Sequence, residues 1–239
     1  MAADSPSPDD PRLDDDHVRT LDGGQVTLVG VVHDHPASRY RVHEIVSRRA
    51  PDVLALETPP LALPLFRQYA ADDREIPAFG GEISAAISAA DEARVVGIDG
   101  IDGRFVRTLA ANLRRERASL STVRSLGSAV TSVLRHATVC RLAATVCDLT
   151  GLRLEVDKPV DHDCSLRDAP TVQADDERSH LTQSLTLLRV ADPPEPVKLR
   201  DETREECMAE RLTALREEGD VVAVVVRGHL DPLADLLTR

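Results

Sequence analysis

Short, almost entirely aliphatic runs recur along the chain and are separated by segments in which apolar residues have helical spacing. The runs are QVTLVGVV (25–32), VLAL (53–56), RVVGID (94–99) and VVAVVV (221–226). A strand that is apolar at successive positions must be buried on both faces, which is typical of parallel sheets covered by helices. The order strand–helix–strand–helix–strand therefore predicts an α/β fold: a mainly parallel central sheet with helices on both faces.

The segments around these runs complete the predicted fold. HVRTL (17–21) precedes the first run across Asp22-Gly23-Gly24, which predicts an antiparallel hairpin at one edge of the sheet. Residues 151–198 have no readable periodicity, so residues 104–198 are interpreted as a helical insertion in a single α/β domain spanning 17–239. Helices are expected over residues 38–50, 61–73, 82–93, 104–118, 120–150, 201–218 and 232–238.

Charge and composition argue against several classes of partner. The formal charge is −12, and Lys158 and Lys198 are the only lysines. An acidic, lysine-poor surface is poorly suited to nucleic acid or anionic lipid and resembles that of proteins from a high-salt cytoplasm. No apolar run approaches the length of a membrane span. Residues 1–16 are rich in Pro and Asp and predict a disordered acidic tail, not a signal peptide, so a cytoplasmic protein is expected.

Several predicted strands end in a residue capable of metal binding or acid–base chemistry: His33, Glu57, Asp99 and His229. In open α/β sheets ligands bind outside the carboxyl ends of the strands, where such residues come together. Two imidazoles and two carboxylates could hold a divalent metal, or could act without metal as an acid–base set. Asp34 and His35 are interpreted as supporting residues.

Other histidines and cysteines are given structural interpretations. His17, His43, His136 and His180 are expected to be structural or exposed. The run Asp161-His162-Asp163-Cys164 is interpreted as a solvated loop, not as a metal site, because it lies in the unreadable insertion. Cys140 and Cys147 are seven residues apart and are expected to be buried free thiols on one helix face.

Three blocks of the sequence resemble the TraB/PrgY family, a branch of the wider group that includes Tiki proteases, GumN-like and ChaN-like proteins and erythromycin esterases. The blocks are GVVHDHPASRYRVHEIVSRRAPDVLALETPPLA (30–62), GGEISAAISAADEARVVGIDGIDGRFVRTL (80–109) and TREECMAERLTALREEGDVVAVVVRGHLDPLADLL (203–237). They cover about half of the chain in the order that the family has. The resemblance rests on the ordered set, since no single block is specific.

The resemblance implies a metal-dependent hydrolase that acts on a peptide or another carbonyl substrate. Its two Gly-x-x-His motifs and glutamate map onto His33, Glu57 and His229, which would hold Mn, Zn or Co. Glu82 or Asp99 would support a ligand or act as the base. Arg104 or Arg204 would orient the substrate or stabilise an oxyanion.

Departures from the family pattern keep two alternatives open. Val226 replaces the first glycine of the second motif, and Arg227 brings a cation beside it. A shortened member without the membrane helices of the pheromone-shutdown proteins is expected, and self-association is compatible with the sequence. One alternative is a non-catalytic peptide-binding or regulatory protein. The other is an esterase-like enzyme that uses His and Glu without metal.

Overall fold

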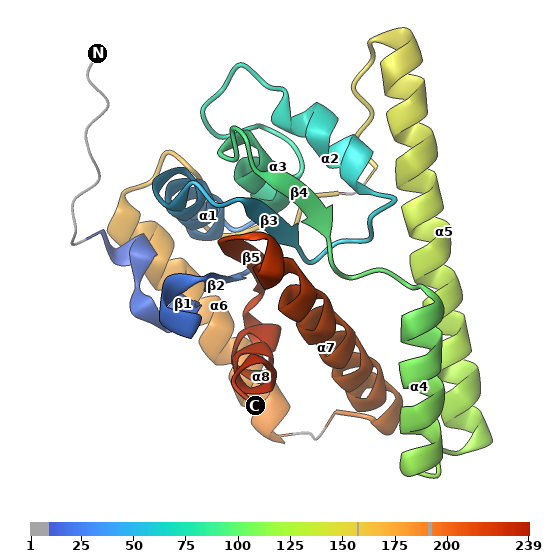
Figure 1. Ribbon diagram of the computed structural model, residues 1–239. Helices are drawn as coiled ribbons and strands as arrows, with labels where there is room; N and C mark the ends of the chain where they lie inside the picture. Colours follow the sequence, from blue (N-terminus) through green and yellow to red (C-terminus); the bar gives the residue numbers. More distant parts are fainter. Residues whose placement is uncertain (1–9, 157, 191–192) are drawn as a thin grey trace.

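The computed structural model describes residues 10–156, 158–190 and 193–239. Within these ranges five strands form one sheet in the order β1-β2-β5-β3-β4 (Figure 1). Neighbouring strands are parallel except β1 and β2, which form an antiparallel hairpin at the edge. The predicted α/β fold is therefore confirmed. The strands are β1 (Val18–Leu21), β2 (Val26–Val31), β3 (Val53–Leu56), β4 (Arg94–Gly97) and β5 (Val221–Val226).

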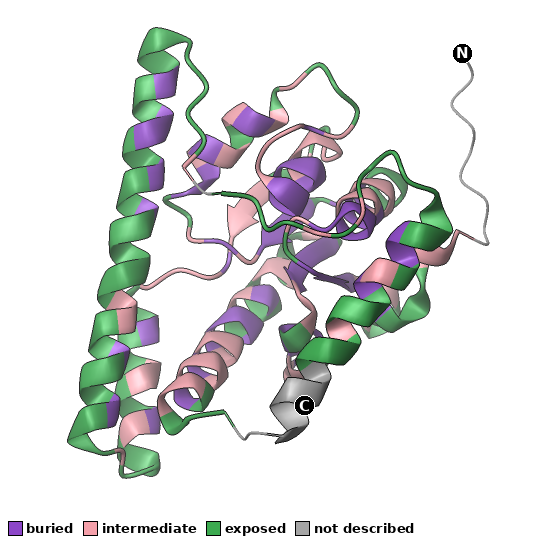
Figure 2. Cartoon of the chain, turned by 180° about the vertical axis from the view of Figure 1, so that it is seen from behind, coloured by how far each residue is buried: buried purple, intermediate pink, exposed green. Residues whose placement is uncertain are grey.

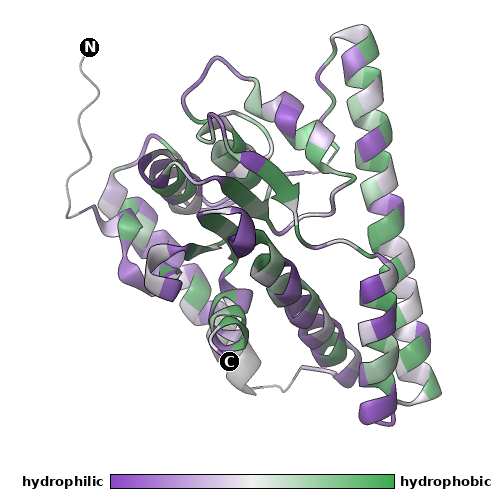
Figure 3. Ribbon diagram, viewed as in Figure 1, coloured by the Kyte–Doolittle hydropathy of each residue, from purple (hydrophilic) through white to green (hydrophobic). Residues whose placement is uncertain are grey.

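The last strand of the chain lies in the middle of the sheet. β5 pairs with β2 along its whole length and with β3 over residues 221–224. Its residues are aliphatic and nearly all buried, because both faces and both edges of this strand are covered (Figure 3). As a result, the carboxyl ends of β2, β5 and β3 are neighbours at one edge of the sheet.

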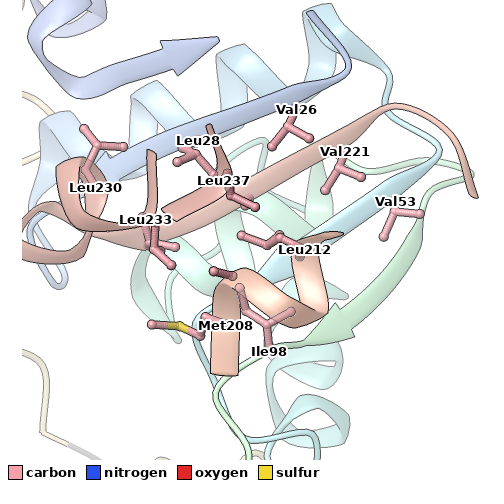
Figure 4. Close-up of a cluster of buried hydrophobic side chains, with 14 residues drawn as sticks. Val26, Leu28, Val53, Ile98, Met208, Leu212, Val221, Leu230, Leu233 and Leu237 are labelled. Atoms are coloured by element: carbon pink, nitrogen blue, oxygen red, sulfur yellow. The ribbon is translucent and has the colours of Figure 1, made fainter. Parts of the chain in front are cut away.

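Helices cover both faces of the sheet. Successive side chains of a strand point to opposite faces, so Leu28 and Val29 of β2 belong to different clusters of buried residues. On one face, α7 (Glu195–Leu215) and α8 (Arg227–Leu237) pack residues such as Met208, Leu212 and Leu233 against the strands (Figure 4). The other face is covered by α1 (Pro36–Arg49), α2 (Leu63–Ala70) and α3 (Gly81–Ser88).

The segment between β4 and β5 contains α4 (Gly103–Arg115), α5 (Leu120–Thr150) and α6 (Pro170–Val190). α5 has the predicted boundaries, and Cys140 and Cys147 are buried together against α2, as expected. Most of the outer surface of α5 is exposed (Figure 2). α6 lies in the part of the sequence with no readable periodicity. Its described buried residues include polar Gln173 and Glu177, which interrupt the apolar face that sequence analysis would detect.

The N-terminal segment differs from its prediction. Residues 1–9 of the predicted disordered tail lie outside the described residues. The prediction is wrong for residues 10–16, which form 3-10 turns at Pro11–Leu13 and Asp15–His17. The Arg12 guanidinium lies over the Tyr40 ring, 3.3 Å from its centroid, and the Arg12 carbonyl accepts a hydrogen bond from Arg41. These contacts hold the turns against α1.

No helix in the described part of the chain is long and apolar enough to cross a membrane.

Candidate functional site

The strand-end residues predicted from the sequence lie along the carboxyl edge of the sheet. His33 lies in the turn after β2, Glu57 directly follows β3, and Asp99 lies two residues after β4. His229 lies in the first turn of α8, which begins at Arg227 immediately after β5, not at residue 232 as predicted. The Nε2 atom of His229 is 3.5 Å from Oε1 of Glu57, so the ends of β3 and β5 are joined directly.

Arg204 of α7 is at the centre of this network. Its guanidinium donates to Oε1 of Glu57 at 2.6 Å and to both carboxylate oxygens of Asp99 at 2.9 and 3.1 Å. Its Nη1 lies 3.2 Å from Nε2 of His229. Burial lowers the pKa of Arg204, but Asp99 and Glu57 outweigh it, so the net pKa is raised. Arg204 is therefore a fixed cation with counterions from β3 and β4.

His229 is oriented by a glutamate that sequence reasoning missed. Its Nδ1 lies 2.8 Å from Oε1 of Glu205. Because Arg204 can only donate a hydrogen bond to Nε2, a neutral His229 carries its proton on Nδ1, where Glu205 accepts it. Burial lowers the pKa of His229, but Glu205 and Glu57 together raise this pKa by more, so the net shift is upward. The adjacency of Glu205 to Arg204 on one helix was the only sequence signal for this contact.

His33 has an equivalent partner in Glu82, in the first turn of α3. Nδ1 of His33 lies 2.8 Å from Oε1 of Glu82, whose Oε2 accepts from the backbone N–H of Asp34 at 2.9 Å. The hydrogen bond to Glu82 raises the pKa of His33. Glu82 is buried, but the His33 side chain is 59 % exposed, so its Nε2 is on an accessible ring.

A glycine allows α3 to approach the His33 turn. Gly81 has φ +54°, and a Cβ at this position would collide with Oδ1 of Asp34. Asp34 itself has φ +58°. A larger residue at position 81 would be strained by the positive φ and would displace the Asp34 carboxylate beside the start of α3, where Glu82 holds His33.

His33 and Glu57 line one pocket of about 290 Å³. Glu82 and Asp34 contribute further polar atoms to it. The remaining wall is largely apolar and comes from α2, α3 and the segment before residue 161: Leu65, Phe66, Tyr69, Ile83, Val156, Pro159 and Val160. The pocket thus combines an imidazole and carboxylates with an apolar wall.

The structure does not bring Arg104 to this edge. The Arg104 guanidinium pairs with Glu210 at 2.9 Å on the exposed surface between α4 and α7. Of the two predicted arginines, only Arg204 contacts the strand-end residues.

Comparison with known proteins does not assign the chain. No family model, curated protein or solved structure matches it.

The predicted metal ligands do not form a ligand set in this structure. Among the described residues, the one group of three His, Cys, Asp or Glu ligand atoms within 4.8 Å of one another is His35, Cys164 and Asp176. His33, Glu57 and His229 form no such group. Oε1 of Glu57 and Nε2 of His229 both face the guanidinium of Arg204, which takes the place that a shared ion would need.

The run 161–164 is more than the solvated loop predicted from the sequence. Asp161 and Asp163 are exposed, but His162 and Cys164 between them are half-buried. Nε2 of His162 lies 2.8 Å from the carbonyl oxygen of His33, and Sγ of Cys164 lies 3.7 Å from Nε2 of His35. The alternation of acidic residues with His and Cys was the signal available in the sequence.

Proposed function

We propose that the chain is a hydrolase that cleaves a carbonyl substrate, such as an ester or a peptide amide, at the carboxyl edge of its sheet. The observation that carries this proposal is the His33–Glu82 pair beside the pocket that also contains Glu57. A carboxylate that accepts from Nδ1 fixes the tautomer and leaves Nε2 as a proton acceptor, as in known acid–base pairs. His33 would take a proton from water and return it to the leaving group.

The remaining strand-end residues would define the charge around the substrate. Both oxygens of Glu57 are occupied, one by Arg204 and the other by the backbone N–H of Val226 at 2.7 Å. Glu57 is thus a fixed carboxylate, and the remaining lone pairs of its oxygens would accept from an N–H or ammonium group of the substrate. Asp99, Arg204 and His229 hold it in place, while the apolar wall would accept a hydrophobic side chain.

Two forms of this chemistry differ in their need for metal. The resemblance to the TraB/PrgY family favours Mn, Zn or Co at His33, Glu57 and His229. The contacts of Arg204 favour the metal-free His and Glu route, because a guanidinium and a divalent cation cannot occupy the same place between Glu57 and His229. We therefore assign the proton transfer to His33 and Glu82 without metal.

Activity measurements test the proposal directly. The full chain, in high-salt buffer with EDTA, is offered nitrophenyl esters of increasing acyl length and peptide anilides. We expect hydrolysis, and we expect His33→Asn to lower kcat/KM by about 10²- to 10⁴-fold, the usual effect of losing a general base. The control is His43→Asn, a half-exposed histidine on α1 that does not line the pocket.

Other results would contradict the proposal. Equal hydrolysis by the wild type and His33→Asn would remove His33 from the mechanism. No turnover of any substrate would favour the non-catalytic binding protein. The EDTA test is repeated with Cys164→Ser, so that a metal ion bound by the cluster of His35, Cys164 and Asp176 cannot account for the result. Activity that disappears with EDTA and returns with Mn²⁺, Zn²⁺ or Co²⁺ in that variant would favour the metal-dependent route.

The pH dependence of His33 should be set by Glu82. The hydrogen bond to Glu82 raises the pKa of His33, so the protonated ring is favoured in the folded state. Stability from this pair is present below the ordinary histidine pKa of about 6.5 and is lost as pH rises through the raised pKa. Conversely, the neutral base accumulates, and kcat/KM rises, only as pH passes that raised value.

We expect Glu82→Gln to lower the pKa of His33 and to shift the rise in kcat/KM to lower pH. An NMR titration of the imidazole resonances measures this pKa without any substrate. Glu205→Gln is the matched control, because it should change the titration of His229 but not that of His33. An unchanged His33 titration in Glu82→Gln would show that the contact does not set its pKa.

A further inference from the structure

His35, Cys164 and Asp176 come from three separate parts of the chain and meet at one point. His35 precedes α1, Cys164 lies in the segment before α6, and Asp176 lies on α6. Oδ2 of Asp176 is 3.1 Å from Nε2 of His35, and Sγ of Cys164 is 3.7 Å from the same nitrogen. The His35 side chain is fully buried. This cluster is distinct from the strand-end residues to which the hydrolase activity is assigned.

The separations within the cluster match those around a small tetrahedral ion. With a metal–sulfur distance of ~2.3 Å and a metal–nitrogen distance of ~2.0 Å, tetrahedral geometry places the two ligand atoms about 3.5 Å apart. A nitrogen and a carboxylate oxygen on the same ion are about 3.4 Å apart. Both values are close to the distances from His35 to Cys164 and Asp176. An ion would therefore require small side-chain movements and a shift of the His35 proton from Nε2 to Nδ1, which now accepts from the backbone N–H of Ala37.

The same atoms are poorly arranged for nucleophilic catalysis by Cys164. In a catalytic triad the acid contacts one imidazole nitrogen and the nucleophile contacts the other. Here Cys164 and Asp176 both face Nε2, while Nδ1 of His35 accepts from the backbone N–H of Ala37 at 3.1 Å. Burial and the negative charge of Asp176 also raise the pKa of the Cys164 thiol to about 12. Convergence on a single nitrogen suits a shared cation instead.

His162 lies beside the cluster and could supply a fourth ligand. Its ring centroid is 4.7 Å from that of His35 and 5.5 Å from that of His180. Nε2 of His162 contacts the carbonyl oxygen of His33, which can only accept, so this nitrogen carries the proton. Nδ1 of neutral His162 therefore has a free lone pair on the ring that adjoins the cluster.

We propose that His35, Cys164 and Asp176 bind a divalent cation of the zinc type, and that His162, which lies outside this group of three, turns toward the ion as the fourth ligand. Thiolate, imidazole and carboxylate together are the donors that zinc prefers in tetrahedral sites. The ion takes the place of the Nε2 proton of His35, which would move to Nδ1 as the contact from the Ala37 N–H opens, and it displaces the proton of the Cys164 thiol. Binding therefore releases one proton per ion.

The position of this site gives the ion a structural role. The segment 158–165 forms part of the pocket wall through Pro159 and Val160, and the backbone N–H of Val160 donates to Asp34 at 3.0 Å. Cys164 is on this segment, and His35 follows the His33 turn by two residues. A bound ion would therefore fix the pocket wall to the turn that presents His33.

Cobalt(II) titration of the full chain, freed of metal with a chelator and dialysed, tests the proposal. We expect one equivalent to bind, with a thiolate-to-cobalt charge-transfer band and the intense visible bands of a tetrahedral ion. Zinc should displace cobalt and raise the Tm. Cys164→Ser should abolish the charge-transfer band and weaken binding by more than about 100-fold, since even outer contacts of a ligand contribute about 10- to 100-fold.

Matched variants separate this site from other thiols and from the proposed active site. Cys147→Ser, Asp163→Asn and His33→Asn should each keep the band and the affinity, and Asp176→Asn should weaken both. No cobalt or zinc binding to the wild type would overturn the proposal, as would binding without a thiolate band. An unchanged affinity in Cys164→Ser would also overturn it. These measurements need no substrate, so they test metal binding whether or not the protein is a hydrolase.

Discussion

Replacing Glu177 by glutamine is expected to lower the free energy of unfolding by about 3–5 kcal/mol, the usual cost of removing one partner of a buried ion pair. Glu177 and Arg41 are each about 1 % exposed at the side chain and form a two-point contact through both carboxylate oxygens. Without the carboxylate charge, Arg41 would remain buried without a counterion, while the glutamine amide would face two guanidinium nitrogens.

This ion pair connects several elements. Arg41 also donates to the carbonyls of Gly30 at the end of β2 and Arg12 in the N-terminal turn, and Ser38 of α1 donates to Glu177 of α6. Loss of the pair should therefore loosen α6 and the N-terminal turn together. Because α6 carries Asp176, the cluster with His35 and Cys164 should be weakened as well.

Denaturant unfolding at constant salt measures the effect. Asp175→Asn is the control, because its pair with Arg178 on the same helix is exposed and should contribute about 0.2–1 kcal/mol. Equal losses in the two variants would contradict the expectation.

The stability from this ion pair should also depend on pH. Burial raises the pKa of Glu177, but Arg41 lowers this pKa by more, so the net pKa is lowered. The stability that depends on this charge is thus present above the ordinary carboxyl pKa, and the difference between wild type and Glu177→Gln should fade as pH falls through the lowered value.

Replacing Arg204 by methionine is expected to cost about 3 kcal/mol of unfolding free energy, because it leaves Glu57 and Asp99 without their cation. The Glu57 side chain is only 5 % exposed, so water cannot replace the guanidinium fully. Arg204→Lys should lie between wild type and Arg204→Met, since an ammonium keeps the charge but cannot contact both oxygens of Asp99 in the same way.

The same variant tests what occupies the place between Glu57 and His229. With the guanidinium gone, Oε1 of Glu57 and Nε2 of His229 would be free to bind a cation that prefers oxygen and nitrogen ligands. Mn²⁺ should therefore raise the Tm of Arg204→Met more than that of the wild type. Arg104→Met is the control, because its pair with Glu210 is exposed and should contribute little. The contrary result is that Arg204→Met and Arg104→Met lower the free energy of unfolding equally, with no rise in Tm on adding Mn²⁺ to either. That result would show that Arg204 does not hold Glu57, Asp99 and His229 together.

Much of the framework could be read from local patterns. The aliphatic runs identified all four parallel strands, and the edge hairpin and α5 followed from turn residues and helical spacing. Because strands of a parallel sheet end at a common edge, the sequence also indicated that His33, Glu57, Asp99 and His229 would gather there. Their roles in hydrolysis and metal binding remain predictions.

Contacts between polar residues that are far apart in the sequence could not be read in this way. α6 was not recognised because its buried face contains polar Gln173 and Glu177, and the Arg41 partner of Glu177 lies on another element. Glu177 contacts Arg41, 136 positions away, and Cys164 contacts His35, 129 positions away. Such contacts leave no periodic pattern in the sequence, because the two polar residues come together only when the elements that carry them pack in the folded structure.

The sequence by itself determined the sheet, most of the helices around it and the edge at which the strand-end residues gather, since these follow from local apolar periodicity and from the common direction of parallel strands. Only the tertiary structure decided which groups meet at that edge. It placed the Arg204 guanidinium where a metal shared by Glu57 and His229 would lie, and it brought Cys164 to His35 beside the His33 turn. Packing of α6 and α7 against the sheet sets these encounters, and packing depends on the whole fold.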